Sequence, residues 1–165
     1  MQLLIVRHAI AFEPDARRWP DDGLRPLSRR GAGRAAPAAR GLKRLAPAPL
    51  RVWVSPLRRT RQTAAILTRF ADWPEGEECV QLLPGAAPEA LLAALARAPE
   101  KCLAVVGHQP GLGRLIGACL PGRAHPGAFE LKKMGAALLH FPGAARAGGG
   151  TLLWLLPPRI LRAAA

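Results

Sequence analysis

Short apolar runs that lead into polar residues recur along this chain, and they limit its fold more than any other feature. The runs at residues 3–7, 52–54 and 103–106 contain β-branched side chains and are too short for helices. Runs of this kind are typical of strands buried on both faces of a sheet. Helical patterns follow at 57–70 and 112–120. The repeated order of strand, turn and helix predicts an α/β fold.

Other elements are weaker but fit the same pattern. Ser28 offers an N-cap for a helix that extends to about residue 45, and Pro37 is expected to kink or break that helix. A weak strand is expected at 79–83 and a helix at 88–98. The segment 9–26 lacks periodicity and predicts a long loop, a length that is commonly functional.

The last third of the chain differs because no helix separates its strands. Residues 136–141 and 151–156 flank a Gly-rich connector, which predicts an antiparallel pair at the edge of the sheet. We therefore expect one three-layer α/β domain over residues 1–165. It has a mostly parallel central sheet, helices on both faces and antiparallel edge strands at the C-terminus.

The composition is that of a globular protein, since half of the 165 residues are apolar. No apolar run of about 18 or more residues occurs, and the N-terminal MQLLIVRH lacks the basic region of a secretory signal. Cys79, Cys102 and Cys119 are widely spaced, form no metal-binding pair and suit a reducing compartment. We expect a cytoplasmic protein without membrane association, and the sequence leaves its oligomeric state open.

The net charge of +13, from 24 basic and 11 acidic residues, favours anionic partners. A nucleic acid, an acidic protein surface or a phosphate-bearing substrate would all satisfy this requirement. The basic residues are scattered along the chain, and there is neither zinc-finger spacing nor an aromatic and basic ribonucleoprotein signature. The sequence therefore disfavours a nucleic-acid-binding module.

Polar groups directly follow three of the predicted strands. Arg7 and His8 end the first strand, residues 55–59 follow the second, and His108 comes just after the strand at 103–106. Ligands of open α/β sheets bind at the carboxyl ends of the strands, so these side chains are expected to meet at one edge. A guanidinium fork suits phosphate better than it suits a neutral ligand. Two histidines with two or more arginines therefore indicate a phosphate pocket.

Three segments resemble the signatures of the histidine phosphatase superfamily, in particular its small SixA-type phosphohistidine phosphatases. These segments are LLIVRHA, VSPLRRTRQT and VVGHQPGL. Asp22, residues 25–28 and Gly31 are similar to the family's short segment before the first helix, so the resemblance covers almost the whole chain. It implies a single histidine phosphatase domain and a phosphorylated substrate.

The resemblance also implies roles for individual residues. In the family the histidine of the first signature becomes phosphorylated, which assigns that role to His8. Arg7, Arg59 and His108 then complete the phosphate pocket as catalytic and substrate-binding residues. The family's commonest first signature has glycine after the histidine, whereas this chain has Ala9.

The implied mechanism is metal-independent phosphoryl transfer. His8 must be neutral to attack phosphorus, and we expect repulsion from Arg7 and Arg59 to keep it so. Its other ring nitrogen should donate to a carbonyl group, and a cationic His108 should help to hold the phosphoryl oxygens. No carboxylate cluster of the kind that binds Mg²⁺ occurs in the sequence, so we expect neither a metal nor a cofactor.

The substrate remains open between two chemical classes. One is phosphohistidine, including phosphohistidine on a protein, and the other is a small-molecule phosphate monoester, which needs a general acid for its basic leaving group. Glu13 and Asp22, in the loop after the first signature, are the candidate proton donors. His125 and His140 lie outside the signatures and are not expected to be catalytic.

Overall fold

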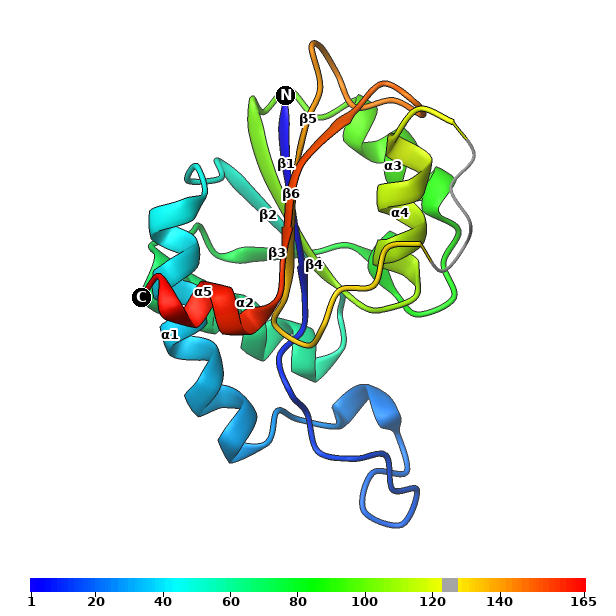
Figure 1. Ribbon diagram of the computed structural model, residues 1–165. Helices are drawn as coiled ribbons and strands as arrows, with labels where there is room; N and C mark the ends of the chain where they lie inside the picture. The colour runs from blue at the N-terminus through cyan, green and yellow to red at the C-terminus, as the bar shows by residue number, and fades with distance from the viewer. Residues whose placement is uncertain (123–127) are drawn as a thin grey trace.

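The computed structural model describes residues 1–122 and 128–165 (Figure 1). Within these residues one sheet has the strand order β3-β2-β4-β1-β5-β6. Its strands are β1 (Gln2–Arg7), β2 (Arg51–Val54), β3 (Gly76–Glu78), β4 (Cys102–Gly107), β5 (Ala136–His140) and β6 (Thr151–Leu156). The first four run parallel to one another, whereas β5 is antiparallel to β1 and β6 is antiparallel to β5. The predicted sheet, with its antiparallel C-terminal pair at one edge, is confirmed.

Helices cover both faces of this sheet, which gives the three predicted layers (Figure 1). They are α1 (Arg29–Leu45), α2 (Arg58–Ala71), α3 (Pro88–Ala96), α4 (Gly111–Cys119) and α5 (Pro158–Ala163), with single 3₁₀ turns at Asp22–Leu24 and Val80–Leu82. Alternate side chains of β1 point to opposite faces. Leu4 and Val6 pack with α1, α2 and α5, whereas Leu3 and Ile5 pack with α3 and α4. No helix in this part of the chain is both long and apolar enough to cross a membrane.

The first helix begins where the sequence predicts it. The Ser28 hydroxyl accepts a hydrogen bond from the Gly31 amide at 3.0 Å, which satisfies one of the free amide groups of the first turn. Pro37 was expected to kink or break this helix, but α1 continues from Arg29 to Leu45 as a single element. Packing against both α2 and α5 holds the helical backbone through the proline.

The prediction of a strand at 79–83 is wrong. The strand in this part of the chain is β3, which begins three residues earlier. Residues Val80–Leu82 form a 3₁₀ turn, which buries Leu82 in the core beside α3 while Val80 remains exposed. Leu82 therefore packs with the helices rather than within the sheet. The exposed residues of β3 pair with β2 at the sheet edge. The short helix α5 was also not predicted.

Two glycines of α1 offer a matched test of how closely α5 packs. A Cβ atom at Gly41 would lie 1.7 Å from the carbonyl oxygen of Leu161, whereas a Cβ atom at Gly33 would meet no atom within 4 Å. We expect Gly41→Ala to lower the free energy of unfolding by about 1–3 kcal/mol, because backbone must move to relieve the overlap. Gly33→Ala should raise it by about 0.5–1 kcal/mol through helix propensity.

Urea unfolding followed by circular dichroism measures both changes. Gly33→Ala is the control for replacing a helical glycine in itself. Equal effects of the two substitutions would contradict the close approach of α1 and α5.

Candidate active site

Strand pairing brings the two signature histidines together. In the parallel register of β1 and β4, Arg7 lies opposite Gly107, and the His8 amide donates to the Gly107 carbonyl at 3.0 Å. His8 and His108 therefore follow neighbouring strands at the same edge. Their ring centroids are 5.1 Å apart with the ring planes tilted by 55°. Both residues are buried, with exposed fractions of 7% and 5%.

His8 is held in one tautomer. Its Nδ1 lies 2.7 Å from the carbonyl oxygen of Ala9, which can only accept a hydrogen bond, so Nδ1 carries the proton and Nε2 has a free lone pair. The pKa of His8 is lowered to about 4, mainly by burial, with a smaller contribution from the charges of Arg59 and Arg7, while the Ala9 carbonyl opposes the shift. The expected neutral form is thus supported, but desolvation contributes more than the predicted repulsion.

His108 differs from the cationic form expected from the sequence. Burial lowers its pKa to about 3, with further contributions from His8, Arg59 and Arg7. Its Nε2 lies 2.9 Å from the Oγ of Ser55, which is itself completely buried. Because a hydroxyl group can donate as well as accept, this partner suits a neutral imidazole ring.

Two arginines lie beside the histidine pair: Arg59 is buried and Arg7 is partly exposed. Arg7 Nη1 donates to the Leu131 carbonyl at 2.7 Å, and Arg59 Nη1 donates to the Asp22 carbonyl at 2.9 Å. The Nε atoms of both guanidinium groups are buried and have no hydrogen-bond partner among the described residues. Burial lowers the pKa of both groups, and nearby carboxylates, Glu130 for Arg7 and Asp22 for Arg59, oppose the shift. Buried donors without acceptors favour an anionic ligand.

The first turn of α2 concentrates positive charge, since Arg58, Arg59 and Arg61 all lie there and no acidic residue does. Cations are disfavoured at a helix N-terminus. Of these three only Arg59 is buried, at 4% exposure, whereas Arg58 and Arg61 are exposed. A buried arginine at this end is repelled by the positive end of the helix dipole. An anion bound here would offset both the charge of Arg59 and the positive end of the dipole.

The two candidate proton donors differ in position. The carboxylate of Asp22 lies 2.6 Å from Arg25 Nε and 3.1 Å from Arg59 Nη1, so it is at the edge of the phosphate pocket. Hydrogen bonding to Arg25 is the main reason why the pKa of Asp22 is lowered, and the nearby Arg59 charge adds to it. Glu13 is not brought into the pocket: its side chain is 83% exposed and lies 3.9 Å from Lys133.

Sequence reasoning gave no role to two hydroxyl groups that shape the pocket. Ser55 contacts His108, as described above, and Thr63 joins the first signature to the second. The Thr63 hydroxyl donates to the Arg59 carbonyl at 2.7 Å and accepts from the Ala9 amide at 3.0 Å. Ser55 could have been found from its place directly after β2, the position that His8 and His108 take after their own strands. Thr63 is one turn after Arg59, and only the fold reveals its contact.

The other histidines and the acidic residues add no second centre. His140 is exposed at the end of β5, and His125 lies outside the described residues. Within residues 1–122 and 128–165, no three His, Cys, Asp or Glu side chains are grouped to hold a metal ion.

Comparisons with known proteins agree with this fold. The model of the histidine phosphatase superfamily (branch 1) matches residues 3–78. An uncharacterized protein of Picosynechococcus sp. strain PCC 7002 is 37% identical, over 95% of this chain and 100% of that protein. Phosphohistidine phosphatase SixA of Escherichia coli K12 is 29% identical, over 99% of this chain and 98% of that protein.

A solved structure of the protein histidine phosphatase SixA, in complex with tungstate, superposes with a TM-score of 0.83 at 27% identity. The match covers 98% of this chain and 99% of that chain. The protein described here belongs to the histidine phosphatase superfamily. Within the superfamily it is a phosphatase with the SixA-type fold.

Burial of His8 predicts how the free energy of unfolding depends on pH. The pKa of His8 falls from 6.5 to about 4 on folding, so between these values the unfolded chain binds more protons than the folded chain. Its contribution to stability is therefore complete above about pH 6.5 and is lost as the pH falls toward 4. The slope reaches about 1.4 kcal/mol per pH unit for one histidine.

His8→Gln removes this group, so its free energy of unfolding should fall less steeply with decreasing pH than that of the wild type. Urea titrations at several pH values between 4 and 6.5 measure the difference between the two slopes. Parallel curves would contradict a buried neutral His8.

Proposed function

We propose that this phosphatase hydrolyses phosphohistidine through a covalent phosphoryl intermediate on His8. The observation that carries the proposal is the pairing of a buried, neutral His8 of fixed tautomer with two guanidinium groups whose buried Nε atoms have no partner in the described chain. A neutral imidazole ring is a nucleophile, and buried guanidinium groups bind phosphoryl oxygens. The same side chains therefore provide both the attacking atom and the anion site.

Two displacements complete the proposed reaction. In the first, Nε2 of His8 attacks phosphorus, a new P–N bond forms, and the P–N bond to the leaving imidazole breaks as that imidazole takes a proton. In the second, water attacks phosphorus and the His8–phosphorus bond breaks. Inorganic phosphate leaves and His8 returns to its neutral form. Its Nδ1 keeps the hydrogen bond to the Ala9 carbonyl throughout. Positioning and charge neutralisation supply most of the rate in such transfers.

Charge changes in the pocket accompany substrate binding. A phosphoryl dianion beside His108 would raise its pKa by attraction, so His108 could then donate a proton or a hydrogen bond to the phosphoryl group. Arg59 would exchange its contacts with Asp22 for contacts with phosphoryl oxygens. Arg7 would use its buried Nε in the same way. These groups provide the positive charge that a metal ion supplies elsewhere, so we propose a metal-independent reaction.

The comparisons favour this substrate class over others. The Escherichia coli relative is named a phosphohistidine phosphatase, and the superposed structure is of a protein histidine phosphatase with tungstate, an oxyanion. The two candidate acids support the same choice. Asp22 is ion-paired with its pKa lowered, and Glu13 is exposed and outside the pocket. A phosphohistidine can expel an imidazole that is readily protonated near neutral pH, so it needs no dedicated acid.

Substitution of His8 tests the covalent step. His8→Ala should lower kcat for a phosphohistidine peptide by about a hundredfold or more, because the nucleophile is lost. Rapid-quench labelling with a ³²P-phosphorylated peptide should trap an acid-labile phosphoenzyme in the wild type and none in this variant.

His140→Ala is the matched control, since His140 is exposed on β5 and takes no part in the proposed mechanism. It should retain both the label and the turnover rate. A labelled and fully active His8→Ala variant would refute the assignment.

Leaving-group dependence separates phosphohistidine from small-molecule monoesters. With EDTA present throughout, we expect kcat/KM for phosphohistidine and aryl phosphates to exceed that for alkyl phosphates by about a hundredfold or more, as a site without a general acid requires. Glu13→Gln and Asp22→Asn should leave the ratio between the two groups unchanged. Similar values for both groups, with alkyl turnover lost in either variant, would identify a dedicated acid and a small-molecule phosphatase. Restoration of activity by a divalent ion would overturn metal independence.

A further inference from the structure

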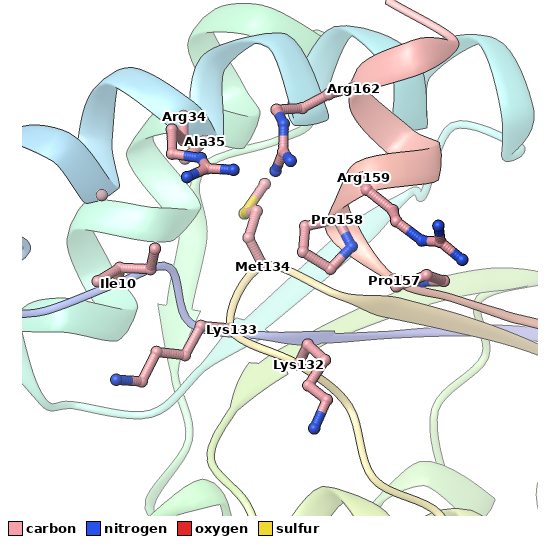
Figure 2. Close-up of a pocket in the computed structure, with 11 residues that line it drawn as sticks. Ile10, Arg34, Ala35, Lys132, Lys133, Met134, Pro157, Pro158, Arg159 and Arg162 are labelled. Atoms are coloured by element: carbon pink, nitrogen blue, oxygen red, sulfur yellow. The ribbon is translucent and has the colours of Figure 1, made fainter.

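A pocket of about 390 Å³ lies beside the active site, between α1, α5 and the turn that leads into β5 (Figure 2). Its rim is formed by five cationic side chains. Arg34 comes from α1, Arg159 and Arg162 come from α5, and Lys132 and Lys133 come from the turn. None of the residues that line the pocket is acidic.

These cations are poorly neutralised by the protein itself. Among the described residues, no carboxylate lies within 4.0 Å of the guanidinium groups of Arg34, Arg159 or Arg162. Among the acidic residues that the structure describes, the two lysines pair only with exposed glutamates: Lys132 lies 2.8 Å from Glu130, and Lys133 lies 3.9 Å from Glu13. Five positive charges around one hollow repel one another and attract anions. The pocket therefore fits an anionic partner.

The arrangement of the cations indicates what kind of anion fits. Figure 2 shows the head groups of Lys132, Lys133 and Arg159 pointing in different directions around the rim, while those of Arg34 and Arg162 approach the centre. Convergent guanidinium groups suit a single phosphate, whereas separated cations suit several separated acidic groups. The three separated cations favour Asp and Glu side chains along a polypeptide, and the convergent pair of Arg34 and Arg162 suits one carboxylate of such a segment.

The floor of the pocket is apolar. Ala35 and Met134 are buried there, and Ile10, Pro157 and Pro158 are partly exposed. An apolar floor gains free energy by covering an apolar side chain, at roughly 25 cal/mol per Å² of apolar surface buried. A fully hydrated polyanion would leave this surface uncovered. The observations therefore favour a segment that combines acidic residues with at least one apolar residue.

The pocket is joined to the active site through the backbone. The Met134 amide donates to the carbonyls of both Arg7 and His8 at 3.1 Å, and Ile10 is two residues after His8. Met134 adopts a left-handed backbone conformation with φ of 64°, which is rare for a residue with a side chain. Strained residues of this kind cluster at functional sites. A polypeptide seated in the pocket would thus lie directly beside the phosphate site.

We propose that this basic pocket docks an acidic and apolar segment of a protein that carries the phosphorylated side chain. Binding of the segment stands on the pocket alone, while its place on the substrate rests on the proposed function. Docking would increase the affinity for the substrate protein. Once the phosphorylated side chain is bound in the phosphate site, binding of the acidic segment in the basic pocket becomes intramolecular. Charge complementarity would also speed the encounter at low salt.

The test uses a short fluorescein-labelled peptide of alternating Glu and Leu that carries no phosphate. Fluorescence anisotropy should show binding to the wild-type protein, and replacing each Glu by Gln, or each Leu by Ser, should weaken it about tenfold or more. The variant Arg34→Glu/Arg162→Glu should weaken binding to the same degree. A matched control, Arg97→Glu/Arg114→Glu, changes net charge equally on exposed residues of the opposite helical layer and should alter Kd less than about threefold.

Each other outcome would overturn the proposal. Equal weakening by both double variants would indicate an effect of net charge alone, and displacement of the peptide by inorganic phosphate would place it in the phosphate pocket. An oligonucleotide that binds better than the peptide and loses affinity with Arg34→Glu/Arg162→Glu would make this a nucleic-acid site. Circular dichroism checks that each variant is folded. If Arg34→Glu/Arg162→Glu unfolds, weaker peptide binding by the Arg159→Glu variant, at an exposed residue, and weaker binding of the Gln peptide to the wild type still test the proposal.

The same assay is independent of the catalytic proposal. Peptide binding without phosphohistidine turnover would reject the proposed function and leave the pocket intact. Turnover without peptide binding would reject docking alone.

Discussion

The parallel pairing of β1 with β4 is the interaction on which the rest of the site depends. Both strands are almost entirely buried, so their register is strongly fixed by the packing of each face. That register joins His8 to Gly107 by a backbone hydrogen bond and so places His108 beside it, although a hundred residues separate the histidines along the chain. The next strand extends the same edge, because the Ser55 amide bonds to the Val106 carbonyl. The backbone at His8, Ser55 and His108 is therefore positioned by the central strands of the sheet.

Much of this could be predicted because burial and chemistry leave clear local marks. Apolar runs with β-branched residues identified the central strands, and the polar residues after them identified the edge where Arg7, His8, Arg59 and His108 lie. The catalytic roles of these four residues came from the resemblance to a family rather than from spacing alone, and they remain proposals. The Ser28 cap was visible because it requires only a neighbour three residues away.

What could not be predicted depends on contacts between distant segments. The low pKa of His108 arises mainly from burial, which the sequence does not reveal, so a cationic ring was expected instead. The contacts of Asp22 with Arg59 and of Thr63 with Ala9 likewise need the fold. The basic pocket also went unrecognised because its cations, scattered along the sequence, come together only when α5 packs on α1.

Strand β3, which lies outside the predicted segment 79–83, affects how molecules of this protein can associate. It ends the sheet, and free strand edges can recruit strands from other chains into aggregates. This edge is only three residues long, all three residues are exposed, and Glu77 and Glu78 form ion pairs with Arg51 and Arg61 at 2.6 and 3.2 Å. Adding a further strand would bring it against these charged side chains for very few backbone hydrogen bonds. The β3 edge of the sheet therefore offers little to a strand from another molecule.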